Sequence, residues 1–459
     1  MTRSPISYST HARATLALGL PLVGSSLAQI ALHTVDTVMV GWYGVIELAA
    51  LVIGSSTFFI LFVLGSGFAK AVMPLAAHAR AAGQDAELRR AARMGLWLST
   101  IFGLSIYPVF WFSEAVLLGL KQDPAVAALG QDYLRIIGLG MIPALWVAVL
   151  QSWLAALGRT QVVLAVTLVA IGINIGLNWL FVFGNAGFPE MGVAGAALTT
   201  FSVQVFSLLV LGLYAGLLPA LRPYRLFRRF WRLDRPALAE VFRLGWPIGL
   251  TGLAEGGLFE ASAIMMGWIG PAQLAAHGIA LQVAAMTFMV HVGLSSAATI
   301  RIAGYHGIGD ARALRDAAKV AIGLSLCVAA GVIALFLTLP ERIVALFIDP
   351  SDPMAGQILA VGAMLLGFAA LFQLADATQA MALGLLRGIK DARAPMWIAA
   401  ISYWLIGIPS SYLLAFKAGY GPAGLWMGLV IGLVAAGASL MLRFWRLAPQ
   451  PGVAGQPPL

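Results

Sequence analysis

Long apolar stretches separated by short polar connections run along almost the whole chain. Each stretch has roughly 20 residues or more, the length that a helix needs to cross a lipid bilayer. We therefore expect an all-α polytopic membrane protein with twelve transmembrane helices. They lie near residues 14–41, 46–71, 93–113, 130–155, 161–184, 192–219, 244–268, 274–299, 317–339, 356–386, 395–416 and 421–442.

The composition supports this prediction and excludes several classes of protein. Of the 459 residues, 60% are hydrophobic and 10% are charged, whereas a soluble domain has roughly 25% charged residues. A soluble enzyme, a disordered chain and a nucleic-acid binder are therefore excluded. The single cysteine, Cys327, allows no intramolecular disulfide. The first apolar stretch is too long for a signal peptide, and we interpret it as a retained helix.

The basic residues indicate the orientation in the membrane. Alternate assignment of the connections places 24 of the 28 Lys and Arg residues on the side of the N-terminus, and leaves Lys121, Arg135, Arg342 and Lys417 opposite. The positive-inside rule then predicts that both termini are cytoplasmic. We expect a cytoplasmic N-terminal segment at 1–13 and a disordered cytoplasmic tail at 447–459, which is rich in Pro and Gly.

The most basic stretch lies between the sixth and seventh apolar stretches, at 220–243. Its arginines alternate with Phe and Trp, and we interpret it as an amphipathic cytoplasmic linker that rests on anionic membrane lipids. They are Arg222, Arg225, Arg228, Arg229, Arg232 and Arg235.

The sequence also repeats itself at an offset of 226 residues. Leu18-Gly19-x-Pro21 returns as Leu244-Gly245-x-Pro247, and Gly67 returns as Gly293. The halves, 14–219 and 244–446, then hold six spans each and have the same orientation. This 6+6 repeat predicts two six-helix lobes related by a pseudo-twofold axis along the membrane normal, a layout typical of transporters.

Four acidic residues, Asp36, Glu255, Glu260 and Asp376, fall inside predicted spans. A charge there is unfavourable, so each is a functional candidate, although a structural hydrogen bond to a neighbouring helix is the alternative. Glu255 and Asp376 lie at similar depth in the same half, and such a pair can hold a cation or share a proton. We expect no Lys or Arg at comparable depth.

Further polar residues share helix faces with these carboxylates. The i, i+4, i+7 spacing places Gln29 and His33 beside Asp36, and the i−3, i+3 spacing places Gln373 and Gln379 beside Asp376. Two more candidates, Asn174 and Asn178, share a face of the fifth span and could hydrogen-bond Asp36 across the first bundle. Two prolines early in their spans, Pro21 and Pro247, are candidate hinges, with a static kink as the alternative.

Motifs for ATP use or catalysis do not occur in the sequence. It contains no G-x-x-x-x-G-K-[ST], H-E-x-x-H or G-x-S-x-G pattern. We therefore expect no cofactor and no enzymatic activity, and energy must come from an ion gradient.

Several segments resemble the multidrug and toxic compound extrusion (MATE) transporters, in the NorM-like branch. They are Val35-Asp36-Thr37-Val38-Met39-x-Gly41, Leu244-Gly245-x-Pro247 with Glu255 eight residues on, and Asp376-Ala377-Thr378-Gln379 leading to Leu386-Arg387-Gly388-x-Lys390-Asp391. The resemblance implies two six-helix lobes arranged as a V in the inner membrane of a bacterium. It also implies export of amphipathic, often cationic drugs and toxic compounds in exchange for Na+ or H+, and hence antibiotic resistance.

The resemblance also suggests a role for each carboxylate. Asp36 would be the N-lobe ion-coupling residue, and Glu255 with Asp376 would form the C-lobe cation site, where a Na+ ion is the only metal expected. His33 and Glu260 are atypical for the family and are assigned as supporting polar residues. We expect a monomer.

Two other functions remain open at this point. A flippase for a lipid-linked precursor has the same layout, but it would need several cationic residues to hold a pyrophosphate. An intramembrane enzyme would need a nucleophile–base pair or paired aspartates in a G-x-G-D pattern, and we find neither.

Overall fold

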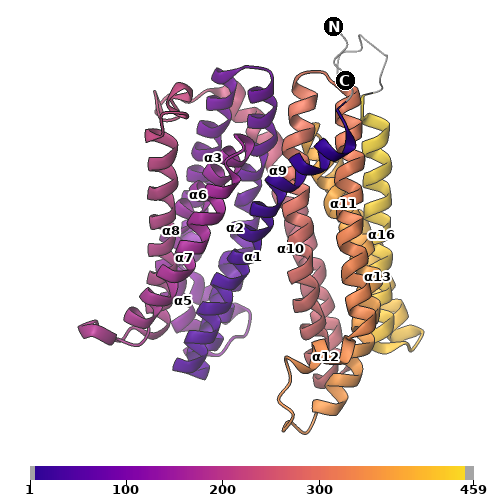
Figure 1. Cartoon of the computed structure of the whole chain (residues 1–459). Coiled ribbons are helices and arrows are strands. Elements are labelled where there is room, and N and C mark those ends of the chain that lie inside the picture. The colour runs from indigo at the N-terminus through magenta and orange to yellow at the C-terminus, as the bar shows by residue number, and fades with distance from the viewer. Residues whose placement is uncertain (1–5, 450–459) are drawn as a thin grey trace. The chain divides into compact units, whose positions relative to one another are not determined.

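The structure, a computed structural model, describes residues 6–449 and is helical along nearly all of them (Figure 1). No strand occurs in this range, so the predicted all-α class is confirmed. Ten helices are long and apolar enough to cross a membrane, and one bent pair of helices is an eleventh such span. The twelfth expected span is α9 (Arg235–Ile269), whose hydropathy is lowered by Glu255 and Glu260. The predicted tail lies outside the described residues from 450 on.

The contacts between residues divide the chain into two compact units. One unit is Gly24–Gly249, and the other consists of the described residues up to Val23 together with those from Leu250 on. The predicted lobes at 14–219 and 244–446 differ from these units, because the division passes through helices α1 (Tyr8–Tyr43) and α9 and not through the linker between the halves.

The unit Gly24–Gly249 contains most of α1 and the beginning of α9. In its interior, α2 packs on α3, α5 and α6, while α7 packs on α8. Its other elements are α2 (Val45–Ala81), α3 (Asp85–Trp111), α4 (Ser113–Gly119), α5 (Pro124–Leu139), α6 (Met141–Ala156), α7 (Thr160–Phe181), η1 (Asn185–Gly187), α8 (Gly192–Leu217) and η2 (Arg222–Tyr224).

The other unit contains the beginning of α1 and most of α9. Helix α13 is its centre, since it packs on α10, α11 and α16. The remaining elements are α10 (Pro271–Gly307), α11 (Ala311–Thr338), α12 (Pro340–Ala345), α13 (Ala355–Gly388), α14 (Arg393–Ala400), the π-helix η3 (Ile401–Gly407), α15 (Ile408–Tyr412), the π-helix η4 (Leu413–Lys417) and α16 (Gly421–Leu447).

Two predicted spans are not regular α-helices. The span expected at 130–155 consists of α5 and α6, which meet at an angle of 45° beside Gly140; Pro143 cannot donate a hydrogen bond there. The span expected at 395–416 contains the two π-helical stretches around Pro409, which likewise lacks an N–H group.

The division between the units falls two residues after Pro21 in α1 and two residues after Pro247 in α9. The beginning of each helix therefore belongs to one unit, and the rest of the same helix belongs to the other. Because the two prolines are equivalent in the sequence repeat, both halves of the chain have the same exchange of helix beginnings.

Glycines allow the exchanged helix beginnings to approach their partners closely. A Cβ atom on Gly67 of α2 would overlap the main chain of Gly245 and Gly249 in α9. A Cβ on the repeat equivalent, Gly293 of α10, would lie 2.6 Å from the backbone nitrogen of Val23 in α1. Backbone atoms cannot move away as a flexible side chain can, so both contacts require glycine.

Arg301 of α10 fastens the beginning of α1 within the same unit. Its Nη1 donates to the carbonyl oxygen of His11 at 2.5 Å and to Oγ1 of Thr15 at 2.7 Å, and its Nη2 donates to His11 Nδ1 at 2.6 Å and to the Tyr305 hydroxyl at 3.1 Å. His11 is fully buried. Three hydrogen bonds from one guanidinium therefore hold the segment before Pro21 against α10, and the fourth, to Tyr305 of α10 itself, orients the guanidinium.

Substitution of Gly67 or Gly293 by alanine should destabilise the protein. We expect a loss of about 1–3 kcal/mol for each, because the added methyl group overpacks a backbone contact. Thermal unfolding of the purified protein in detergent measures it. The matched control is Gly331→Ala in α11, where a Cβ would meet nothing within 4 Å; it should be neutral or stabilising. Equal effects at all three positions would contradict the close-packing interpretation.

Replacement of Arg301 by glutamine should also lower stability. The variant loses the bonds to His11 and Thr15 and leaves buried acceptors without donors, which costs about 1–3 kcal/mol. Arg312→Gln, at an exposed arginine of α11, is the control with the same change in charge. An unchanged unfolding temperature for Arg301→Gln, measured in the same way, would show that the bonds do not hold α1.

Candidate functional site

Asp36 is buried in the unit Gly24–Gly249, with 8% of its surface exposed. Its Oδ1 accepts hydrogen bonds from the side-chain amides of Asn174 at 2.9 Å and Asn178 at 2.7 Å, both on α7. Its Oδ2 accepts a hydrogen bond from the hydroxyl of Thr200 on α8 at 3.1 Å. The predicted contacts of Asn174 and Asn178 are therefore confirmed. Together the four residues form a carboxylate site enclosed by three helices.

Sequence reasoning missed Thr200 and also Tyr133, a buried residue of α5 that interacts electrostatically with Asp36. A threonine in an apolar span is too common to be a signal by itself. Its position on α8, five residues after a Gly192-x-Ala194-Gly195 motif that returns as Gly421-x-Ala423-Gly424 in the second half, was the available indication.

Of the three polar residues expected to share one face of α1, only Asp36 belongs to this site. Gln29 and His33 are both exposed, whereas Asp36 is buried. His33 interacts electrostatically with Asp36 and contacts the ring of Phe59 edge-on, with 6.3 Å between the ring centroids. No hydrogen bond among the described residues joins Gln29 or His33 to Asp36, so helical spacing alone overestimated their involvement.

A second site lies in the other unit, where Glu255 of α9 meets α13. Gln379 donates from Nε2 to Glu255 Oε1 at 3.1 Å. Asp376, with 2% of its surface exposed, interacts electrostatically with Glu255. The structure thus brings Glu255, Asp376 and Gln379 together as the sequence predicts. Gln373 is also buried, and its amide donates to Thr287 of α10, which the sequence did not suggest.

Arg387 and Tyr403 interact electrostatically with this second site, so a cation lies within electrostatic range of it, which the sequence did not suggest. Each interacts electrostatically with Glu255, and Tyr403 also interacts with Asp376. Arg387 lies in the last turn of α13, but an arginine side chain is long enough to extend along its helix. The two carboxylates therefore lie within electrostatic range of one guanidinium.

Several buried polar atoms of the second site have no hydrogen-bond partner among the described residues. Unpaired polar atoms in a protein interior are unfavourable and need an explanation, such as a bound ion or water. Carboxylate, amide and hydroxyl oxygens are hard ligands that suit small cations. The atoms are Asp376 Oδ1, Gln373 Oε1, Gln379 Oε1 and the Tyr403 hydroxyl.

Glu260 does not belong to either site. It is exposed on α9, five residues after Glu255 and therefore on a different side of the helix. Among the described residues it makes no hydrogen bond or ion pair. In the same range, no cluster of three or more His, Cys, Asp or Glu residues occurs that would suit a transition metal or zinc.

Apolar spans in two repeated halves, each with a buried carboxylate site, define a polytopic membrane protein of the transporter type. The chain belongs to the MatE family, whose family model matches residues 21–180 and 247–413.

Related proteins agree over nearly the whole chain. The chain is 44% identical to a protein of Agrobacterium fabrum described as a probable multidrug resistance protein NorM, over 95% of this chain and 94% of that one. It is 42% identical to a protein of Rhizobium meliloti with the same description, over 97% and 96%.

Solved structures of similar fold have only about one residue in five in common with this chain. A crystal structure of a MATE protein in complex with MaD3S has a TM-score of 0.85 at 20% identity and covers 95% of this chain and 96% of its own. The eukaryotic MATE transporter AtDTX14 has a TM-score of 0.82 at 20% identity, with the same coverage. These similarities confirm the fold.

The contacts of Asp36 predict a stability coupling with Asn178. Asn178→Leu should destabilise the protein by about 1.5–3 kcal/mol, because a buried carboxylate loses a donor. In an Asp36→Leu background the same substitution should be nearly neutral, so a double-mutant cycle of thermal unfolding should give a coupling of at least about 1 kcal/mol. Gln29→Leu, at an exposed position of α1, is the control. Combined with Asp36→Leu in the same cycle, it should show no coupling energy. Additive effects of Asp36→Leu and Asn178→Leu would refute the coupling.

Proposed function

We propose that the protein is a secondary active exporter of amphipathic, often cationic compounds, driven by inward movement of Na+ or H+. The observation that carries this proposal is the pair of intramembrane carboxylates, buried Asp376 and half-buried Glu255, beside unpaired buried oxygen atoms. The descriptions of the bacterial relatives as multidrug resistance proteins support the substrate class.

The coupling follows from the chemistry of the two sites. An ion or proton that binds at Glu255 and Asp376 neutralises charge in a region of low dielectric, and its loss restores that charge. Such an ion drives a conformational change only if it binds the two conformations with different affinity. Asp36, with three hydrogen-bond donors, is the corresponding ion-coupling site in the other unit.

The positive charge of Arg387 competes with the transported cation for the carboxylates of the second site. With the site empty, the guanidinium compensates part of the charge of Glu255, and an arriving cation or proton must compete with it. An ion site with a built-in competitor releases its ion more readily than a pair of uncompensated carboxylates. Transport requires such release on the cytoplasmic side.

Pro21 and Pro247 are the proposed hinges. Each lies two residues before the division between the units, in a helix that passes from one unit into the other. A proline inside a helix removes one backbone hydrogen bond and makes bending easier.

The membrane potential supplies a useful driving force. One charge that moves inward across 100 mV provides about 2.3 kcal/mol, which is a concentration ratio of about 50 before any ion gradient is added. Acidic groups among apolar and aromatic side chains favour lipophilic cations through Coulomb and cation–π attraction. We place the protein in the inner membrane with both termini cytoplasmic, from the distribution of Lys and Arg.

The test is efflux of a fluorescent lipophilic cation from proteoliposomes, with a Na+ gradient and a pH gradient imposed separately. The wild type should respond to at least one of them, which identifies the coupling ion. Glu255→Gln and Asp376→Asn should lower the initial rate about tenfold or more, because each removes an ionisable group from the coupling site.

Glu260→Gln is the matched control, since it removes an exposed carboxylate from the same helix as Glu255 and should transport like the wild type. If folded wild-type protein shows no transport under either gradient, drug antiport is wrong and a lipid substrate becomes the favoured alternative. Equal loss in Glu260→Gln would contradict the assignment of the site.

A further inference from the structure

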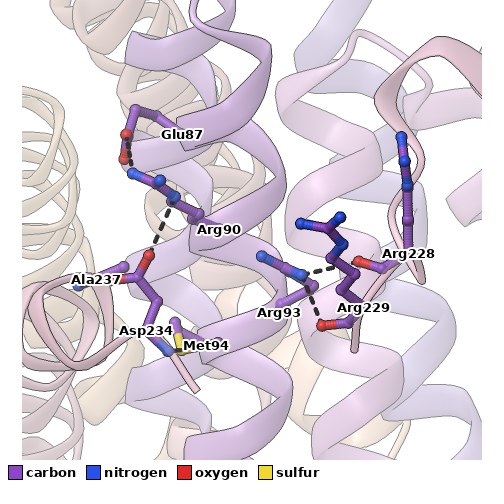
Figure 2. Close-up of polar contacts among 8 residues, drawn as sticks. All are labelled: Glu87, Arg90, Arg93, Met94, Arg228, Arg229, Asp234 and Ala237. Carbon is purple, nitrogen blue, oxygen red and sulfur yellow. Dashed lines mark hydrogen bonds and ion pairs between the residues drawn. The ribbon is translucent and has the colours of Figure 1, made fainter. Parts of the chain in front are cut away.

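The basic linker between α8 and α9 is a fixed part of the unit Gly24–Gly249. Helix α3 supplies a row of donors, one turn apart, to the carbonyl oxygens of the linker. Arg89 Nη1 bonds Tyr224 at 3.3 Å, and Trp97 Nε1 bonds Phe230 at 2.9 Å. Between them, Arg93 Nη1 bonds the carbonyl oxygens of Arg228 and Arg229, at 2.8 and 2.9 Å (Figure 2).

Apolar side chains hold the linker from the same side. Leu221 and Leu226 are buried. The ring of Phe230 stacks on Trp97 with 5.8 Å between the ring centroids, and Tyr224 packs edge-on against Trp153 at 6.1 Å. The linker therefore has an inner side of Leu, Tyr and Phe, and its path over α3 is determined by side-chain packing as well as by hydrogen bonds.

The only acidic residue between the end of α8 and the beginning of α9, Asp234, is already engaged. Its Oδ2 pairs with Nε of Arg90 at 3.1 Å, and its Oδ1 accepts a bond from the backbone N–H of Ala237 at the beginning of α9 (Figure 2). It is therefore not available to neutralise the linker arginines.

The outer side of the linker combines unpaired arginines with exposed aromatic rings. Phe227 is 41% exposed and Trp231 is 76% exposed. No hydrogen bond or ion pair of the arginine side chains on this side is found within residues 6–449. We name this set the linker surface; its residues, all exposed, are Arg225, Phe227, Arg228, Arg229, Trp231 and Arg232.

We propose that the linker surface binds the headgroups of anionic phospholipids in the membrane leaflet that it faces. The linker joins two helices that cross the membrane, so it must lie near the headgroup region. Guanidinium groups bind phosphate through paired hydrogen bonds, and Trp and Phe side chains favour the interface below the headgroups. A soluble anionic partner would leave Trp231 and Phe227 without an apolar environment.

The row of donors on α3 holds the linker surface in one conformation, so it can bind anionic headgroups specifically and not only through its average charge. A flexible basic segment attracts anionic lipid only through its average charge, whereas a backbone held at four carbonyl groups presents its arginines at constant spacing. Arg225 and Arg229 have positive φ angles, +48° and +55°, a conformation that non-glycine residues seldom adopt. The contacts with α3 stabilise this local path.

The experiment compares two triple variants with the same change in charge. In the first, Arg225, Arg228 and Arg232 are replaced by glutamine. In the second, three exposed arginines of other segments, Arg312, Arg393 and Arg446, are replaced in the same way. Native mass spectrometry of the full-length protein in neutral detergent then counts bound lipid during titration with phosphatidylglycerol or phosphatidylcholine.

We expect the wild type to bind phosphatidylglycerol in preference to phosphatidylcholine, more weakly as the salt concentration rises. The linker variant should lose about tenfold to a hundredfold in apparent affinity for phosphatidylglycerol, and the control variant should retain it. Equal losses of affinity in both variants would show that only the net charge of the protein matters, and would overturn the proposal. Equal binding of phosphatidylglycerol and phosphatidylcholine by the wild type would also overturn it. Because lipid binding is measured without any gradient, the outcome is separate from that of the transport test.

A further variant separates the lipid site from the folding of the linker. Trp231→Ala removes an exposed ring and leaves the contacts with α3 in place. The proposal predicts weaker phosphatidylglycerol binding for Trp231→Ala with an unchanged unfolding temperature in lipid-free detergent. Wild-type lipid affinity in this variant would contradict the role of the aromatic side chains.

Discussion

An ionisable side chain inside an apolar helix bundle must find its partners within the protein, because no bulk water is available to solvate it. Asp36 meets this requirement with Asn174, Asn178 and Thr200, which fixes how α1, α7 and α8 face one another. Asp376 meets it incompletely, since its Oδ1 and several buried oxygens of neighbouring side chains remain unpaired among the described residues. The site at Asp36 therefore fixes the arrangement of its helices. The site at Glu255 and Asp376 has oxygen atoms that can still bind an ion or a water molecule.

The same requirement acts on the backbone at the ends of the spans, and both halves of the repeat meet it with an arginine at the start of their third span. Arg89 of α3 bonds the segment after α8, and its repeat equivalent, Arg315 of α11, bonds the carbonyl oxygens of Ala448 and Pro449 after α16. The expectation of disorder after residue 447 thus does not apply to these two residues. Arg89 and Arg315 make the same kind of contact in both halves. The contact is therefore a feature of the repeated six-span unit and not of the linker alone.

Periodicity and charge were sufficient to predict the helices, the repeat and most of the carboxylate sites, because these features depend on one helix at a time. The contacts of Asn174 and Asn178 with Asp36 were predictable since both amides lie on one helix face. Thr200 and Tyr403 were not, because their roles depend on which helices become neighbours. Arg387 was missed because its position in the chain indicates a helix end, whereas its electrostatic interaction with Glu255 depends on a neighbouring helix.

The exchange of helix beginnings at Pro21 and Pro247 bears on how such a chain arose. If the two halves descend from one six-span ancestor, two copies of that ancestor with the same exchange would have formed a domain-swapped dimer, each copy contributing the beginning of its first helix to the other. Fusion of the two genes would then have made permanent an association that was already intertwined. Neither half, expressed alone, would possess the segment against which Gly67 or Gly293 packs.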